Sequence, residues 1–142
     1  MASKKWSFRI GLGILILTAG ACSFSVSTAN ISALKLGTDK AVSSETSRFS
    51  TSDTIYAVAV ISNAPGKVKV RGRLAVEDVE GQQTGPIPGL ETSLDLEGSG
   101  SATFTFSAPT AGWPKGKYKL DVILLNEDGA QQGQKSTSFT VS

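Results

Sequence analysis

The sequence contains no histidine, and only one of its 142 residues is a cysteine. Without histidine the chain cannot form Ser-His-Asp or Cys-His catalytic groups, and it lacks the commonest zinc ligand. Because the single cysteine is Cys22, the residues that follow it form no disulfide with one another. The folded part of the chain must therefore be held together by its hydrophobic core alone.

Other patterns that would indicate catalysis or ligand binding are also missing. The carboxylates cluster in expected turns, at 77–80 and 127–128, or stand singly on outward positions, which favours solvated charges over a catalytic pair. Neither acidic turn has the spacing of a calcium loop, and Gly98-Ser-Gly100 precedes no expected helix that would make it a phosphate loop. We predict no enzymatic activity, no cofactor and no metal site.

What the sequence does contain begins with a secretory signal. Three basic residues precede the apolar stretch 10–17, and small residues then lead to Cys22. The stretch 10–21 has only 12 residues, whereas a membrane-spanning helix needs about 20. The pattern predicts a signal peptide over residues 1–21 that is cleaved from the mature protein.

Ala19-Gly20-Ala21-Cys22 resembles the lipobox of bacterial lipoproteins, in which small residues lead directly into a cysteine. The resemblance implies that the Cys22 sulfur receives a diacylglycerol, that cleavage occurs just before it, and that its new amine is acylated. The sequence departs from the pattern at Ala19, where that family most often has leucine. Ala-Gly-Ala also fits ordinary signal cleavage, which would leave Cys22 as a free N-terminal thiol on a secreted protein.

The net charge of +2 describes only the precursor. Residues 1–21 carry three of the 14 basic residues and none of the 12 acidic ones, so 11 basic and 12 acidic side chains remain. This balance gives no support to nucleic-acid binding. Residues 22–30 are predicted to be a lipidated tether, and residues 31–142 are enough for one domain.

The domain shows a period of two rather than helical periodicity. The clearest case is 67–76, where an apolar series alternates with a basic one and predicts one packed and one solvated face. Further strands are predicted at 30–36, 54–62, 90–96, 101–107, 117–126 and 135–141. Residues 38–53 are predicted to form a loop that Phe49 pins to the core, and 82–89 an exposed connection. These roughly seven strands favour an all-β, two-sheet sandwich.

The stretch Gly112-Trp-Pro-Lys-Gly-Lys-Tyr-Lys-Leu-Asp-Val122, followed by a hairpin and Ser138-Phe-Thr-Val141, resembles the closing strands of bacterial extracytoplasmic immunoglobulin-like or fibronectin-III-like domains. The resemblance implies an immunoglobulin-like sandwich of the disulfide-free kind. Pro114 and Gly116 are expected to set a corner, and Tyr118 to hydrogen-bond upstream as a tyrosine corner does. The resemblance carries almost no information about activity, because this architecture hosts unrelated functions.

Two features are candidates for binding. The first is a row of cations on the solvated face of one strand, which becomes a patch if the strand of the last two lies beside it: Lys67, Lys69, Arg71, Arg73, Lys117 and Lys119. Such a patch suits anionic lipid headgroups, acidic glycans or an acidic protein; the alternative is a solvated face that discourages aggregation. The second is Trp113, which would either stack on a sugar ring or cover the end of the core.

Together these patterns predict a lipid-anchored, non-enzymatic binding or scaffolding module on the periplasmic or extracellular side of a membrane in the cell envelope. Its partners would be the membrane, through the lipid, and a protein or glycan. One rival is a carbohydrate-directed accessory domain or a subunit of a glycan-acting enzyme. Another is an inhibitor or chaperone that recognises exposed strands.

Overall fold

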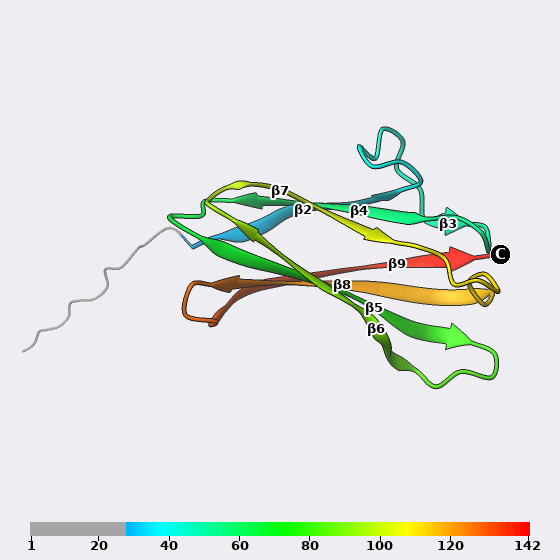
Figure 1. Ribbon diagram of the computed structural model, residues 1–142. Coiled ribbons are helices and arrows are strands. Elements are labelled where there is room, and N and C mark those ends of the chain that lie inside the picture. The colour runs from blue at the N-terminus through cyan, green and yellow to red at the C-terminus, as the bar shows by residue number, and fades with distance from the viewer. Residues whose placement is uncertain (1–27) are drawn as a thin grey trace, which may run out of the picture.

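The computed structural model describes residues 28–142, which form a sandwich of two β-sheets without a helix (Figure 1). Eight strands make up the sandwich: β2 (Asn30–Gly37), β3 (Arg48–Phe49), β4 (Ile55–Ser62), β5 (Val68–Val79), β6 (Gly85–Leu96), β7 (Gly100–Phe106), β8 (Gly116–Asn126) and β9 (Gln131–Val141). The predicted signal peptide and Cys22 lie outside the described residues. Within residues 28–142, no helix is long and apolar enough to cross a membrane.

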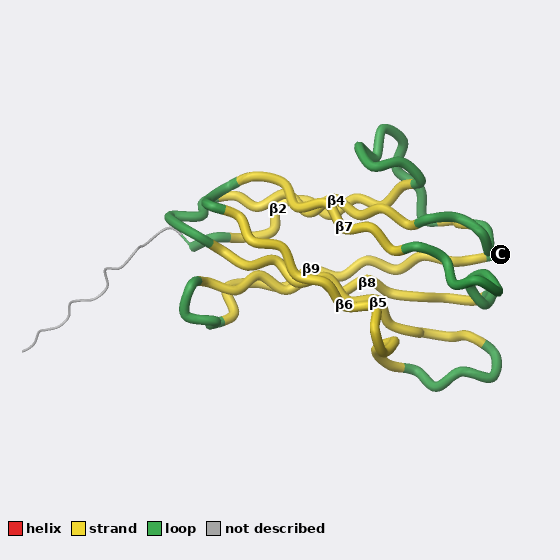
Figure 2. The backbone as a smooth tube through the Cα atoms, viewed as in Figure 1, coloured by secondary structure: helices red, strands yellow, loops and turns green. Residues whose placement is uncertain are grey.

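One sheet has the order β2-β4-β7 and the other the order β3-β9-β8-β5-β6. Neighbouring strands are antiparallel except for β3, which runs parallel to β9. Asn30 pairs with Ser62, so the first strand starts at the end of the sandwich where β4 finishes. Figure 2 shows the two layers of strands, with the connecting loops gathered at the two ends. The all-β, immunoglobulin-like sandwich predicted from the sequence is confirmed.

The core lies between the sheets, and the alternation in β5 explains its composition. Val68, Val70 and Leu74 face inward and are buried, whereas the intervening cations face outward. Gly72 belongs to the same inward series because Phe104 from the opposite sheet lies over it. A Cβ built on Gly72 would come within 3.0 Å of the Phe104 ring. The glycine therefore lets an aromatic ring pack directly on the backbone of β5.

Two aromatic residues fasten the loops as the sequence predicts. Phe49 is buried and meets the Phe139 ring edge-on, with 5.4 Å between ring centroids. The Tyr118 hydroxyl donates a hydrogen bond to the carbonyl oxygen of Pro114, four residues upstream. This is the bond that a tyrosine corner makes. Burial of the hydroxyl raises the pKa of Tyr118 above its ordinary value of 10.0.

The structure extends two of the predicted strands, since β5 runs on to Val79 and β9 already starts at Gln131, and it corrects two of the predicted connections. The loop predicted over 38–53 contains the short strand β3, because burial of Phe49 brings its backbone beside β9. The predicted connection 82–89 is partly strand, since β6 already starts at Gly85, where Pro86 lies opposite Ala75. A proline is tolerated there because β6 is an edge strand, and prolines within sheets are largely confined to edges.

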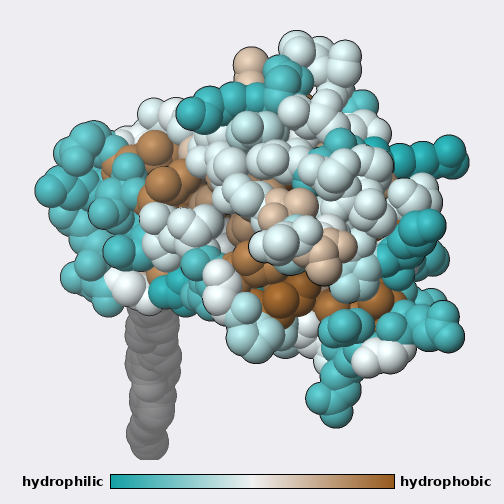
Figure 3. Space-filling model, turned by 45° about the vertical axis from the view of Figure 1, so that its right-hand side comes forward, coloured by the Kyte–Doolittle hydropathy of each residue, from teal (hydrophilic) through white to brown (hydrophobic). Residues whose placement is uncertain are grey.

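One side of the sandwich is less well closed than the other. Strands β6 and β7, the edges of the two sheets, contact one another there. Leu90, Leu94 and Leu96 of β6 pack against the core but stay partly exposed. Figure 3 shows apolar patches lying among hydrophilic surface on the face that it presents.

Candidate functional site

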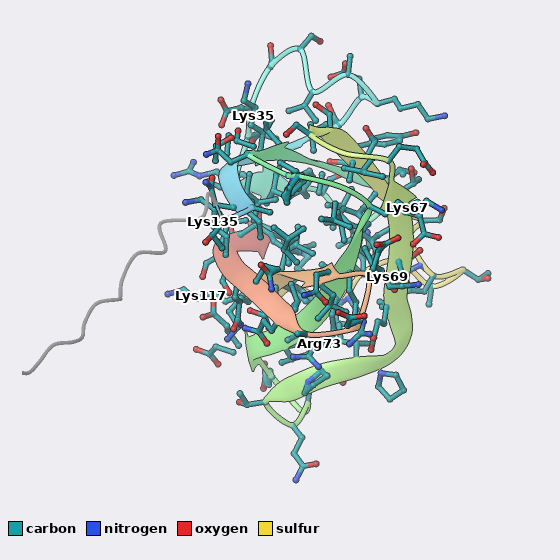
Figure 4. The ribbon with its side chains drawn as sticks, turned by 90° about the vertical axis from the view of Figure 1, so that its left-hand side faces the viewer. Lys35, Lys67, Lys69, Arg73, Lys117 and Lys135 are labelled. Carbon is teal, nitrogen blue, oxygen red and sulfur yellow. The ribbon has the colours of Figure 1, made fainter. Side chains whose placement is uncertain are left out.

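The predicted basic strands are neighbours in the structure. Strands β5 and β8 pair along almost their whole length, and Lys119 lies opposite Ala75. The cations at 69, 71 and 73 therefore share the outer face of the five-stranded sheet with Lys117 and Lys119. Figure 4 separates Lys35, on the three-stranded sheet, from Arg73 and Lys117, which lie on the other side of the sandwich. We call this surface the charged face.

Carboxylates are interleaved with these cations, so the charged face is not a purely positive patch. Lys69 Nζ lies 3.5 Å from Asp95 Oδ1, and Arg71 Nε lies 3.3 Å from Glu91 Oε2. Both carboxylates come from β6, which pairs with β5 on the side away from β8. The side chains of Lys69 and Asp95 are 46% and 76% exposed, so water screens their attraction.

Asp121 is the exception, because it is buried with only 6% of its surface exposed. Its Oδ1 accepts a hydrogen bond from the Ser136 hydroxyl and lies 3.8 Å from Lys119 Nζ. Its Oδ2 lies 3.9 Å from a terminal nitrogen of Arg73. Two cations thus share one carboxylate, which leaves a local excess of one positive charge. Arg73 Nε is buried and has no hydrogen-bond partner within residues 28–142.

In the part of the chain that the structure describes, two of the predicted cations have no such partner: Lys117 on the charged face, and Lys67, which immediately precedes β5. Among residues 28–142, no carboxylate oxygen lies within 4.0 Å of Lys67 or Lys117. Lys117 lines an open recess of about 460 Å³ together with Arg48 and Glu77. Arg48 was not among the residues predicted from the sequence, because its two-residue strand gives no alternation. It reaches this face because Arg48 and Lys117 both lie opposite Thr140 of β9.

Trp113 does not lie on the surface. Its side chain is 3% exposed, and the indole N–H donates a hydrogen bond of 2.8 Å to the carbonyl oxygen of Asp53. Its ring lies 6.3 Å from that of Tyr118, nearly at right angles to it. This is the core-covering alternative, and it leaves no free indole face for a sugar ring. The apolar hollow beside Trp113 holds about 100 Å³, below the roughly 300 Å³ of typical ligand pockets.

The described residues offer no clustered metal ligands, since no group of three or more among His, Cys, Asp and Glu converges within 28–142. The charged face can instead attract an anion or a zwitterionic surface. Alternation along the predicted strand 117–126 puts Asp121 on the same outward side as Lys119 but gives no sign of its burial. That burial depends on Arg73 and Ser136, which only strand pairing brings to it. Sequence reasoning missed the Glu91 and Asp95 contacts for the same reason.

Comparison with known proteins adds information about the fold. No family model matches the chain, and no curated protein matches it by sequence. A Niemann-Pick type C2 protein from the Japanese carpenter ant aligns with 83% of this chain and 96% of its own, with a TM-score of 0.51 and 12% identity. A cycloisomaltooligosaccharide glucanotransferase from Paenibacillus sp. aligns with 80% of the chain, with a TM-score of 0.50 and 20% identity.

A third similar structure is Bacteroides uniformis beta-glucuronidase 2, which aligns with 81% of this chain at a TM-score of 0.50 and 16% identity. The chain spans only 14% of the length of that enzyme and 14% of the glucanotransferase. At such low identity these likenesses concern architecture and not activity. The chain is similar in fold to immunoglobulin-like sandwiches that occur both alone and as one part of much larger enzymes.

Proposed function

We propose that this protein is a membrane-anchored extracytoplasmic lipoprotein that acts as a non-enzymatic binding or scaffolding module in the cell envelope. The observation that carries the binding part is the charged face. Its cations are held on two paired central strands, β5 and β8, whose inner sides form the core. A partner would therefore meet an array of charges with fixed spacing, which costs less ordering than a flexible loop does.

The lipobox-like residues support the anchoring part. Seven residues separate Cys22 from Asn30, where β2 starts, so the Cα atoms of these two residues lie at most about 28 Å apart in a fully extended chain. An acyl chain on Cys22 would keep the domain within that distance of the membrane. More than one chain is needed for stable attachment, which diacylglycerol together with an N-acyl group would provide.

Anchoring is tested by replacing the sulfur. In bacterial cells, the full chain with Cys22→Ser should lose its acyl mass and move from the membrane to the soluble envelope fraction. Ser23→Ala is the matched control, because it lies next to Cys22 but leaves the sulfur unchanged. A native chain without lipid by mass spectrometry, still retained at the membrane, would contradict the anchoring proposal.

Binding is tested on the unpaired end of the charged face. Lys117→Glu should abolish capture of an anionic partner, because it reverses a charge that no carboxylate within 28–142 neutralises. Lys35→Glu is the control, since it makes the same reversal on the other sheet. The readout is co-sedimentation of the full chain with vesicles containing anionic lipid, and with a soluble acidic glycan in parallel. If the two variants bind equally, the charged face is not the binding surface.

An exposed Trp113 that stacks on a sugar ring would favour the carbohydrate-directed alternative. That indole is packed against Tyr118 and hydrogen-bonded to the backbone of Asp53. Because the binding experiment includes an acidic glycan, it also tests a carbohydrate partner. Such a partner would be bound through its charge and not through stacking.

A further inference from the structure

The free edge of β7 is the least protected feature of the sandwich. Among residues 28–142, strand β7 ends the three-stranded sheet and pairs with β4 on one side only. The other side of an edge strand presents a row of unpaired N–H and C=O groups, which can pair with another strand. Proteins commonly block such edges with charges, prolines, bulges or short strands.

The other three sheet edges carry these protecting features. Strand β3 has only two residues. Strand β2 has an irregular register between Ile31 and Ala33 and carries Lys35. Strand β6 has an irregular register opposite Arg73, and its residues include Pro86 and Pro88 as well as two acidic side chains. Each of the three is therefore a poor template for a further strand.

Strand β7 has none of these features. Its seven residues pair with β4 in one unbroken register. Ser101, Thr103 and Thr105 form its outward series, and Phe104 and Phe106 are buried in the core. The chain has no charged residue between Gly98 and Pro114. The edge is thus regular, uncharged and lined by small hydroxyl side chains.

We propose that the free edge of β7 pairs with β7 of a second copy of this chain, which makes one continuous six-stranded sheet. Two identical strands related by a two-fold axis pair antiparallel, and with full overlap Thr103 faces Thr103 while Ser101 faces Thr105. The hydroxyl side chains then meet across the join as favourable pairs. A charged residue near the centre of the edge would instead face its own copy, so absence of charge suits self-pairing in particular.

Two further features agree with a second copy. The partly exposed leucines of β6 lie along the side of the sandwich that β7 borders, so a neighbouring copy would cover part of them. The two-fold axis is perpendicular to the joined sheet, because the paired strands run antiparallel within it. Both charged faces would consequently point to the same side of the pair, and a surface with repeated charges would be bound bivalently.

Disulfide trapping in cells tests the register directly, because the chain has a single cysteine, Cys22. In an antiparallel pair, opposite Cα atoms lie about 4.5 or 5.5 Å apart, within disulfide reach. The full chain with Thr103→Cys, expressed in bacterial cells and oxidised, should run mainly at twice its mass on a non-reducing gel. Ser93→Cys on β6 and the native chain are the controls and should remain monomeric.

A second variant pair keeps the proposal testable if Thr103→Cys disturbs folding. When one chain carries Ser101→Cys and a second, co-expressed chain carries Thr105→Cys, the two chains should cross-link to each other. Ser101→Cys alone should not, because two copies of residue 101 would lie about 13 Å apart along the strands. A folded chain that stays monomeric in both arms would overturn the proposal. So would a cross-link between two copies of residue 101, or an adduct with a different protein. A free Cys22 thiol would also cross-link the native chain and Ser93→Cys, so these two controls separate such a product from pairing through β7.

Discussion

The outer face of the five-stranded sheet carries many charged side chains and that of the three-stranded sheet carries few, although the two sheets enclose one core. The charged face of the five-stranded sheet presents cations of β5 and β8 beside carboxylates of β6 and β8. The outer face of the three-stranded sheet presents Tyr56, Val58 and Val60 on its central strand, and residues 54–66 carry no charge. A monomeric domain needs no such asymmetry to fold. Such a difference is expected of a molecule that makes two kinds of contact. One would be electrostatic, through the charged face, and the other would be strand pairing through the edge of β7.

The largest effect is expected within the charged face, where two neighbouring arginines differ. Arg73→Glu would place a carboxylate beside the buried Asp121 and should lower the free energy of unfolding by about 2–3 kcal/mol, less than for a fully buried pair. Arg71→Glu would face only the exposed Glu91 and should lower it by about 0.5–1 kcal/mol. Urea unfolding measures both. Equal losses would mean that Asp121 behaves as a surface charge.

The two arginines also show how far the sequence predicts this structure. Alternation alone gives the two faces of β5 correctly, because a strand directs successive side chains to opposite sides whatever its neighbours are. It treats Arg71 and Arg73 as equivalent, whereas their partners come from β6 and β8, which are distant in sequence. Periodicity carries no information about which side chains strand pairing brings together.

The same limit applies to Trp113. Its Gly/Pro-rich surroundings predict a corner, and a corner can present an indole either outward or inward. The inward position depends on Asp53, whose carbonyl oxygen accepts the indole hydrogen bond from 60 residues away. Tyr118 was predictable because its partner, Pro114, lies within the same motif. Local hydrogen bonds can be predicted from the sequence, and long-range ones cannot.

A change at Tyr118 affects the core that the two sheets share and leaves both outer faces unaltered. Tyr118→Phe removes the hydrogen bond to Pro114 and should lower the free energy of unfolding by about 1 kcal/mol at neutral pH. Burial raises the pKa of Tyr118 in the folded state. The stabilisation that the protonated Tyr118 hydroxyl gives the folded state is therefore complete below about pH 10. It is lost as the pH rises from there through the folded-state pKa.

The native chain should accordingly lose stability over that alkaline range more steeply than the Phe variant does. Thermal melts followed by circular dichroism between pH 9 and pH 11, about one unit either side of the ordinary value, provide the measurement. Parallel curves for the two proteins would show that the hydroxyl is not desolvated.

On the outer face of the three-stranded sheet, the sign of an introduced charge should matter because Lys35 is the neighbour of Val58 there. Val58 lies directly opposite Lys35 across the β2–β4 pair. Val58→Glu should therefore be more stable than Val58→Lys by about 0.5–1 kcal/mol in urea unfolding. In a Lys35→Ala background this difference should vanish. Its persistence there would indicate another charge acting on Val58.

The smallest effect is expected for the exposed pair Lys69 and Asp95. A double-mutant cycle with alanine at both positions should give a coupling of at most about 0.5 kcal/mol, and less in high salt, because both side chains are largely solvated. A coupling above 1 kcal/mol would make the charged face a stabilising network. With a negligible coupling, these charges contribute almost nothing to holding the fold, and a partner could replace Asp95 beside Lys69 at little cost in stability. The charged face would then differ from the outer face of the three-stranded sheet in what it can bind, and hardly at all in how firmly it holds the sandwich together.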